Sequence, residues 1–344
     1  MRIPEKSITF GTSNPRILIT GATGYIGSTL SAKLAREGYD LTVCGRDPMK
    51  LEFLKTVLNK INGEKINKNK HNFVNLELTD SKQVEKFLEE NRNIDGVIHL
   101  AGLNSNTQSI THPQETYNTN LFGSFNLINS MLNKGIRKIV FISTGSTYGR
   151  IQNTAMIDER LAQHPETPYA KSKVMAERII EDYKVYDLQS VILRLFNVAG
   201  ANSKQDLTIG TNVVSLIMNR LKNGTEFVLN GNRHHTPDGT SIRDFLHIND
   251  ACEAIISSIK YLLTQKNSGL YNVGSGEGTS LGKIIDLSEK VSGQKLNIRV
   301  NPTPQYEPPI LTVDNTRIRT ELGWEPKLDI KNIISDAWEW YLAH

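Results

Sequence analysis

The sequence GATGYIG, at residues 21–27, directly follows the short apolar run at residues 17–19. Glycines at this spacing, between a buried strand and a helix, are typical of a loop that holds a dinucleotide pyrophosphate. Gly21 permits the tight turn, Gly24 lets the backbone approach the phosphates, and Gly27 lets the helix pack closely. The start of the helix offers N–H groups and a positive dipole to the phosphates. We therefore expect dinucleotide contacts from Gly21, Gly24, Tyr25, Ile26 and Gly27.

In the first half of the chain, short apolar runs alternate with segments whose apolar residues have helical spacing. The pattern predicts strands at residues 16–20, 41–44, 73–76, 96–100, 138–143 and 190–195. It predicts helices at residues 25–37, 48–58, 81–91, 114–132 and 168–186. The strands are rich in Val, Ile and Leu with little alternation, as expected for strands buried on both faces. The fold class that follows is α/β, with a Rossmann-type, doubly wound parallel sheet.

The pattern becomes irregular after about residue 196, where Gly, Asn, Pro and Thr are frequent. Helices are still predicted at residues 211–221, 249–263 and 280–291, and strands at 226–229, 270–273 and 297–300. We expect residues 1–195 to form the dinucleotide-binding domain, which returns at about residues 245–275. Residues 196–344 would form a smaller, mixed α/β substrate-binding lobe over the carboxyl edge of the sheet, where such folds bind ligands.

Composition narrows the possible partners. The 344 residues carry a net charge of +4, from 40 basic and 36 acidic residues, which implies no strong polyelectrolyte partner. The basic tract at residues 55–70 has no interleaved aromatic residues, so a solvated loop is expected and nucleic acid is not. His234 and His235 lack further ligands at metal-binding spacing, so no metal is expected. Two cysteines, no membrane-length apolar run and no signal peptide predict a cytoplasmic protein.

Tyr169 and Lys173, in the sequence YAKSK, are four residues apart on a predicted helix and therefore share one face. A free tyrosine has a pKa of about 10. A nearby ammonium and an oxidised nicotinamide would favour the phenolate, which is a general base for alcohol–ketone chemistry. Thr144, at the end of a predicted strand, is placed to hydrogen-bond the reacting oxygen. The predicted catalytic residues are therefore Thr144, Tyr169 and Lys173, and the last two would also contact the cofactor.

The end of the second predicted strand bears on the choice of cofactor. A carboxylate at this place holds the adenosine ribose in NAD enzymes, but here Gly45 and Arg46 occupy it. A small residue followed by arginine favours the 2′-phosphate of NADP. Two alternatives remain open at this stage, because Asp47 is close enough in sequence to reach the ribose and Arg46 is able to stack on adenine.

The chain resembles the extended short-chain dehydrogenases/reductases, most of all the UDP-glucose (UDP-galactose) 4-epimerase group. The resemblance runs from about residue 16 to residue 324. Its motifs are GATGYIG, VIHLAGLN (97–104), YNTN (117–120), STGSTYG (143–149), YAKSK (169–173), RLFNVAGA (194–201), TPDGTSIRDFLHINDA (236–251), YNVGSG (271–276) and ELGW (321–324). The long segment at 236–251 is the one most typical of the epimerases.

The resemblance implies roles for further residues. Cofactor contacts beyond the glycine loop would come from Glu77, Leu78, Leu100, Ala101, Gly102 and Asn120, besides Tyr169 and Lys173. Arg46 is added to these by its position at the end of the second predicted strand. A nucleotide-sugar substrate would be contacted by Asn104, Thr144, Ser146, Asn197, Asn212 and Arg243. Arg243 would hold the diphosphate, because its planar fork binds two oxygens at once. The family also implies a homodimer, formed through the helices at 114–132 and 168–186.

Three departures from the family pattern stand out. Gly45-Arg46 replaces the acid of NAD enzymes, Asn104 stands where sugar epimerases often have lysine, and residues 303–308 lack the usual R-x-G-D. Arg299 is a candidate to replace the missing second diphosphate arginine.

The function expected is a nucleotide-sugar 4-epimerase, with a UDP-hexose substrate, a 4-keto intermediate and NADP or NAD as cofactor. An NADPH-dependent 4-keto nucleotide-sugar reductase is the alternative, and a non-catalytic NAD(P)-sensing protein is a remote one. A 4,6-dehydratase is disfavoured, because Gly145 and Ser146 follow Thr144 where such enzymes place carboxylates.

Overall fold

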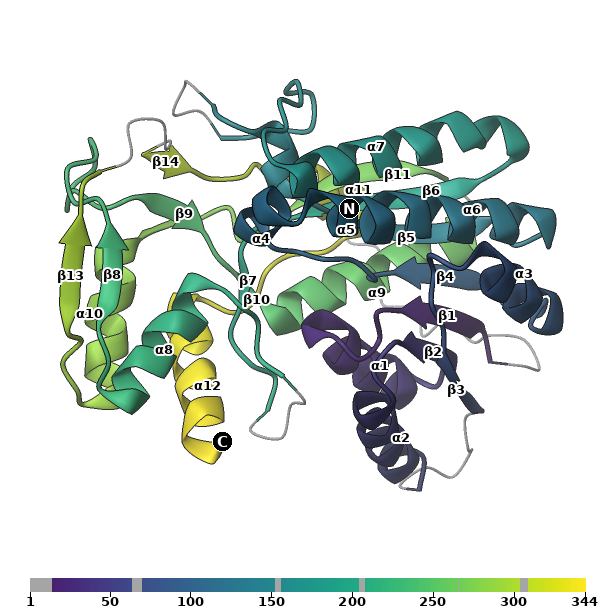
Figure 1. Ribbon diagram of the computed structural model, residues 1–344, viewed down its shortest axis with the longest axis horizontal. Helices are drawn as coiled ribbons and strands as arrows, with labels where there is room; N and C mark the ends of the chain where they lie inside the picture. The colour runs from purple at the N-terminus through teal and green to yellow at the C-terminus, as the bar shows by residue number, and fades with distance from the viewer. Residues whose placement is uncertain (1–13, 64–69, 152–155, 204–207, 266, 304–308) are drawn as a thin grey trace.

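A seven-stranded parallel sheet lies at the centre of the computed structural model, which describes residues 14–63, 70–151, 156–203, 208–265, 267–303 and 309–344 (Figure 1). The strand order is β11-β6-β5-β4-β1-β2-β3. The bounds are β1 (Arg16–Thr20), β2 (Asp40–Gly45), β3 (His71–Asn75), β4 (Gly96–His99), β5 (Lys138–Thr144), β6 (Gln189–Leu195) and β11 (Gly269–Val273). The chain order reverses between β1 and β4, which is where ligands bind in such sheets. The predicted Rossmann-type fold is confirmed.

Helices cover both faces of the sheet. One face carries α1 (Tyr25–Glu37), α2 (Pro48–Gly63) and α9 (Ile248–Gln265), and the other carries α3 (Ser81–Glu90), α6 (Gly123–Asn133) and α7 (Pro168–Asp182). Within β1, Ile17 and Ile19 pack into the first core, whereas Leu18 packs into the second. Both sides of each central strand are therefore buried, which explains why the sequence shows apolar runs rather than alternation.

The single helix predicted at residues 114–132 is three consecutive elements. These are α5 (Pro113–Tyr117), a π-helical turn at Asn118–Phe122, and α6. Such π-turns are frequent at functional sites. The turn contains Asn120, which is fully buried. The predicted helix at residues 168–186 is α7 followed by a 3₁₀ turn at Tyr183–Tyr186.

A second lobe lies to the left of the sheet in Figure 1 and has its own hydrophobic core. Its helices are α8 (Val213–Asn223), α10 (Leu281–Ser292) and α12 (Ile330–Ala343), which pack beside the parallel pair β8 (Phe227–Asn230) and β13 (Ile298–Asn301). The remaining elements are α4 (Asn106–Thr111), α11 (Thr316–Leu322), β7 (Val198–Ala199), β9 (Ile242–Asp244), β10 (Leu246–His247), β12 (Gly278–Ser280) and β14 (Ile310–Leu311).

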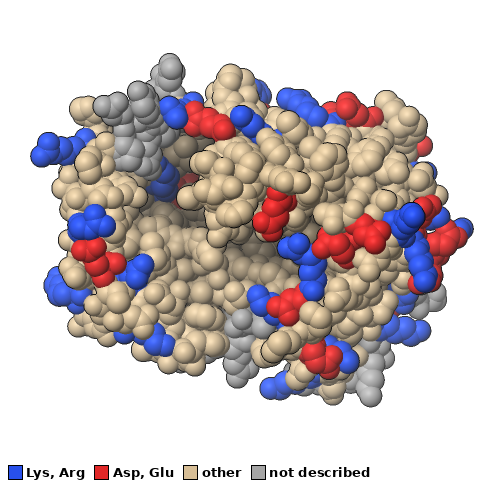
Figure 2. Space-filling view, viewed as in Figure 1, with Lys and Arg blue, Asp and Glu red and all other residues tan. Residues whose placement is uncertain are grey.

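Between the lobes the surface is hollowed, and the hollow is bordered mainly by uncharged residues (Figure 2). Its position matches the carboxyl edge of the parallel sheet, beside α4 and β7 (Figure 1). Among the described residues, no helix has the length and apolar character that a membrane crossing requires.

Candidate active site

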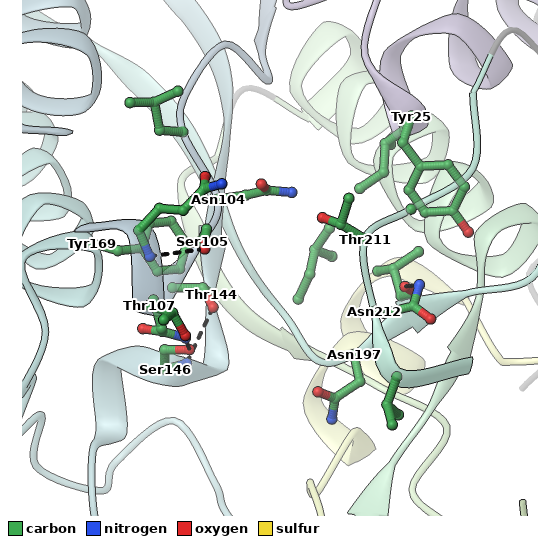
Figure 3. Close-up of a pocket in the computed structure, with 18 of the residues that line it drawn as sticks. Tyr25, Asn104, Ser105, Thr107, Thr144, Ser146, Tyr169, Asn197, Thr211 and Asn212 are labelled. Atoms are coloured by element: carbon green, nitrogen blue, oxygen red, sulfur yellow. Dashed lines mark hydrogen bonds between the residues drawn. The ribbon is translucent and has the colours of Figure 1, made fainter. Parts of the chain in front are cut away.

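A cleft of about 930 Å³ lies between the two lobes and contains most of the predicted site. The predicted residues that line it are Gly21, Gly24, Tyr25, Ile26, Gly27, Leu100, Gly102, Asn104, Thr144, Ser146, Tyr169, Lys173, Asn197, Asn212 and Arg243. Figure 3 shows Asn104, Thr144, Ser146 and Tyr169 on one wall, and Tyr25, Asn197 and Asn212 on the other. Five predicted residues do not line it, namely Arg46, Glu77, Leu78, Ala101 and Asn120.

The charges in the cleft suit an anionic ligand. Lys173 and Arg243 are the cationic side chains among the described residues that line it, and that lining includes no carboxylate. A cleft lined by one sign of charge concentrates ligands of the opposite sign. Ser105, Asn106, Thr107 and Gln108 add neutral polar groups on the wall that carries Tyr169.

The glycine loop is shaped as a dinucleotide cradle. Gly21 has a φ of +69°, and a Cβ there would approach the Ala101 nitrogen to 2.7 Å. A Cβ on Gly27 would lie 2.2 Å from the Gly21 carbonyl oxygen. Gly24 is the N-cap of α1 and brings no side chain over the first turn of the helix. The loop thus leaves room for phosphates at the helix start, so the residues present fit a dinucleotide cofactor.

Tyr169 and Lys173 both point into the cleft from α7 and are almost fully buried. Burial raises the pKa of Tyr169, whereas its hydrogen bond with Thr144 acts in the opposite direction. Burial lowers the pKa of Lys173 to about 8, and the negative charge of Glu177 opposes this. The Lys173 ammonium donates to the Ile142 carbonyl oxygen at 2.9 Å. An ammonium has three donors, so others remain for a ligand.

A hydrogen-bonded chain fixes the start of α7 against the strand end that carries Thr144. Asn106 donates to the Ser146 hydroxyl at 3.2 Å and accepts from the Thr167 hydroxyl at 2.6 Å. Thr167 in turn caps α7 by accepting from the Ala170 N–H. Sequence reasoning missed Asn106, because its spacing to both partners gives no local signal. Its amide links Thr167, which lies two residues before Tyr169, to Ser146, which lies two residues after Thr144.

The missing acid at the adenosine end of the predicted cofactor site has a steric explanation. A Cβ on Gly45 would lie 2.7 Å from the Thr23 side chain, so the strand end admits no larger residue without rearrangement. Arg46 lies 3.8 Å from the Glu77 carboxylate, and both side chains are about half exposed. Asp47 caps α2, because its carboxylate accepts from the N–H groups of residues 49 and 50.

The other predicted cofactor residues lie behind the cleft wall. Asn120 is bound to the backbone of Leu103 by two hydrogen bonds and donates to the Ser172 hydroxyl. The Ala101 N–H points to the Thr20 hydroxyl at 3.4 Å. Leu78 is buried in the core that covers the α6 face of the sheet. In this structure these residues support the wall from behind.

On the second lobe, the asparagines of the predicted substrate site are tied to the backbone. Asn197 donates to the Asp244 carbonyl oxygen, and Asn212 caps α8 and donates to the Val198 carbonyl oxygen. Arg243 donates to the Ile242 carbonyl oxygen at 2.8 Å. The Asp244 carboxylate accepts from the β11–β12 loop, so it anchors that loop.

The second diphosphate cation is not found at Arg299. Its guanidinium donates to Glu226 and to Asn301, each at 2.9 Å, and Arg299 is not among the residues that line the cleft. Most of the segment that departs from the family pattern, residues 304–308, lies outside the described residues. The same is true of residues 64–69 in the basic tract.

The sequence model of one enzyme family matches residues 17–274, which include the glycine loop, Thr144, Tyr169 and Lys173. The chain belongs to the NAD dependent epimerase/dehydratase family. UDP-glucose 4-epimerase of Lactobacillus helveticus is 31% identical over 338 residues, with 96% of this chain and 98% of that protein covered.

Two solved structures extend the likeness to the fold. UDP-glucose-4-epimerase from Stenotrophomonas maltophila, with NAD and formylated UDP-arabinopyranose bound, has a TM-score of 0.87. It is 26% identical, and the match covers 96% of this chain and 98% of that chain. UDP-glucose 4-epimerase from Bifidobacterium longum, in complex with NAD⁺ and UDP, has a TM-score of 0.83 at 27% identity, with 95% and 98% covered. The resemblance to the 4-epimerase group is confirmed.

Proposed function

We propose that this family member is a UDP-hexose 4-epimerase. The observation that carries the proposal is the meeting of three groups in one cleft, namely the glycine cradle, the Thr144–Tyr169–Lys173 set and the Arg243 guanidinium. The first suits a dinucleotide, the second suits alcohol–ketone chemistry, and the third suits a diphosphate. Relatives that share almost the whole length of the chain carry the same activity in their names.

The proposed reaction uses the described side chains as follows. Tyr169 accepts the proton of the sugar C4 hydroxyl, and the Thr144 hydroxyl bonds the same oxygen. The glycine loop and Lys173 would hold the nicotinamide cofactor, which would supply reversible hydride transfer at C4 of the sugar. Lys173 holds the nicotinamide ribose and favours the Tyr169 phenolate by its charge. Because burial raises the pKa of Tyr169, the phenol needs this cationic surrounding to ionise near neutral pH.

The cleft must also release the sugar ring between the two half-reactions. The wall beside Tyr169 offers short neutral side chains, among them Ser105 and Thr107 (Figure 3). Arg243, on the opposite lobe, would keep hold of the diphosphate while the ring turns. A substrate whose diphosphate is held firmly and whose sugar ring is held loosely can react at both faces of C4.

Incubation with a panel of UDP-sugars tests the proposal. We expect UDP-glucose and UDP-galactose to interconvert with only a catalytic amount of cofactor. The alternative is a one-way 4-keto nucleotide-sugar reductase, which Gly45 and Arg46 favour. No interconversion of these sugars, together with consumption of one NADPH for each 4-keto UDP-sugar supplied, would establish the reductase instead.

Arg46 is proposed to read the 2′-phosphate, so that NADP binds more tightly than NAD. The strand end carries Gly45 in place of a carboxylate, and the Arg46 guanidinium is half exposed. Arg46→Ala should weaken NADP binding by about 1.5–3 kcal/mol, the range for a charge-assisted hydrogen bond, and NAD binding by much less. Calorimetric titration with both cofactors checks this. Equal losses for both would mean that Arg46 stacks on adenine.

The protein is proposed to form a homodimer through α5, α6 and α7. Leu127 and Ile128, on α6, lie in the protein's own core and so are not available for an interface. The exposed apolar side chains are Phe122, Phe125 and Met175, which are 55%, 39% and 44% exposed. A second copy covering these residues would bury them in a two-fold contact.

Sedimentation of Phe125→Glu tests the dimer, because a buried unpaired carboxylate would oppose the contact. We expect the wild type to sediment as a dimer at micromolar concentration and the variant to shift toward monomer. Met49→Glu is the matched control, since Met49 is 83% exposed on α2 and should leave the dimer intact. A monomeric wild type would contradict the proposal.

We propose a cytoplasmic location, and the two cysteines support it. Cys44 and Cys252 are both free and buried, as suits a reducing compartment.

A further inference from the structure

Behind the catalytic pair, three side chains from separate parts of the fold converge on the carboxylate of Glu177. Glu177 follows Lys173 by one turn of α7 and is 4% exposed. Arg194 on β6 donates to its two oxygens, at 3.2 Å from Nε and 2.6 Å from Nη2. The Ser143 hydroxyl on β5 also donates to it, and Gln163 donates at 2.8 Å. Ser143 and Arg194 are paired in the register of β5 with β6, so the sheet fixes where these two side chains meet Glu177. The hydrogen bonds from Ser143, Gln163 and Arg194 to Glu177 are called the clamp below.

This clamp touches the active site from behind without entering it. Ser143 stands between Ile142, whose carbonyl oxygen accepts from Lys173, and the predicted catalytic Thr144. Lys173 and Ser143 line the catalytic cleft, whereas Glu177 and Arg194 line a separate cavity of about 480 Å³ beside β11. Glu177 therefore lies out of reach of a substrate in the cleft. Any effect it has on the reaction passes through Lys173 and Ser143.

The Glu177–Arg194 pair is also held from its far side. The Arg194 Nη1 donates to the Tyr148 hydroxyl at 2.8 Å, and that hydroxyl donates to Asn272 on β11 at 2.7 Å. A buried pair with this many hydrogen bonds has a fixed geometry, whereas an exposed ion pair does not. The charge of Glu177 is thus presented to Lys173 at a constant position.

We propose that Glu177 is a positioning residue that keeps Lys173 protonated, with Arg194 as the cation that limits its effect. In the described part of the chain, the charged and titratable groups near Lys173 are His99, Glu177 and, in the same cleft, Tyr169. Burial lowers the pKa of His99 to about 3, so this imidazole is neutral at working pH. Glu177 is then the anion one helical turn from the ammonium, and Arg194 is the cation paired with that anion.

The sign of the expected effect follows from the charge that is removed. Removing the negative charge of Glu177 disfavours the ammonium, so the pKa of Lys173 should fall below its value of about 8. A variant that keeps the carboxylate should lower the pKa of Lys173 by less, whereas a loss of packing alone would not follow the charge.

The test is an NMR titration of isotope-labelled lysines in the full chain, with the Lys173 signal assigned by its absence in Lys173→Met. We expect Glu177→Gln to lower the pKa of Lys173 by about one unit, and Glu177→Asp, which keeps the carboxylate, to lower it by less. Glu181→Gln is the matched control, because Glu181 lies one turn further along α7 and pairs with Lys184 at the surface. It should leave the titration unchanged. If Glu177→Gln does not fold, the smaller fall expected in Glu177→Asp decides.

An unmoved titration in Glu177→Gln, or an equal shift in Glu181→Gln, would overturn the inference. The consequence for turnover rests on the proposed function, in which protonated Lys173 is needed. There, the loss of activity at high pH should begin about one pH unit lower in Glu177→Gln than in the wild type. Because the NMR titration needs no substrate, a wild type without epimerase activity would count against the proposed function alone.

Discussion

Replacing Tyr169 with phenylalanine should abolish turnover while the cofactor stays bound. The phenol is the proposed proton carrier, and phenylalanine keeps the shape of the side chain that lines the cleft. Loss of a general base costs about 10²–10⁴-fold in rate. The measurement is kcat with UDP-galactose, together with the cofactor content of the purified variant.

Tyr183→Phe is the control for this substitution, because Tyr183 lies in the 3₁₀ turn that follows α7, away from the cleft. It should retain wild-type activity. If Tyr169→Phe keeps activity within a few-fold of the wild type, Tyr169 is not the proton carrier.

Replacing Arg243 with alanine should raise the KM for a nucleotide sugar by well over tenfold. Arg243 and Lys173 are the cations among the described residues that line the cleft, and Lys173 faces the nicotinamide end of the proposed site. A diphosphate without a cationic partner is costly to bury, and a charged contact contributes about 2 kcal/mol or more. Cofactor affinity should hardly change, because the glycine cradle lies on the other lobe.

Arg299→Ala separates Arg243 from the second candidate cation of the sequence. Arg299 is engaged by Glu226 on the outer side of the second lobe, so its loss should leave KM close to the wild-type value. A large effect of Arg299→Ala with a small effect of Arg243→Ala would reverse the assignment. If neither substitution changes KM, the substrate carries no diphosphate, and the nucleotide-sugar proposal fails.

The parts of the fold that local sequence determines were predictable. The glycine loop and the apolar run before it predict β1 and α1 with the bounds that the structure has, because tight turns and helix starts depend on neighbouring residues. The π-turn around Asn120 was not predictable, since its sequence continues a helical pattern on both sides. The helix α12 was missed, although Ile330, Ile333, Ile334 and Ala337 follow helical spacing.

The side chains of the site were predictable where they belong to the same sequence motif. Tyr169 and Lys173 share one helix, so their spacing is visible in the sequence. The clamp of Arg194 and Ser143 on Glu177 joins different elements, and only the register of β5 with β6 brings these side chains together. The ion pair of Arg46 with Glu77 likewise joins the ends of β2 and β3. Contacts of this kind depend on tertiary packing, which no local pattern encodes.

Incubation with UDP-glucose deuterated at C4 tests the central claim most directly. If the proposed epimerase mechanism holds, UDP-galactose forms with deuterium still at C4, and no cofactor is consumed. The same hydride then leaves C4 and returns to it within one cleft. Loss of deuterium to solvent, or consumption of one cofactor for each sugar converted, would contradict the account.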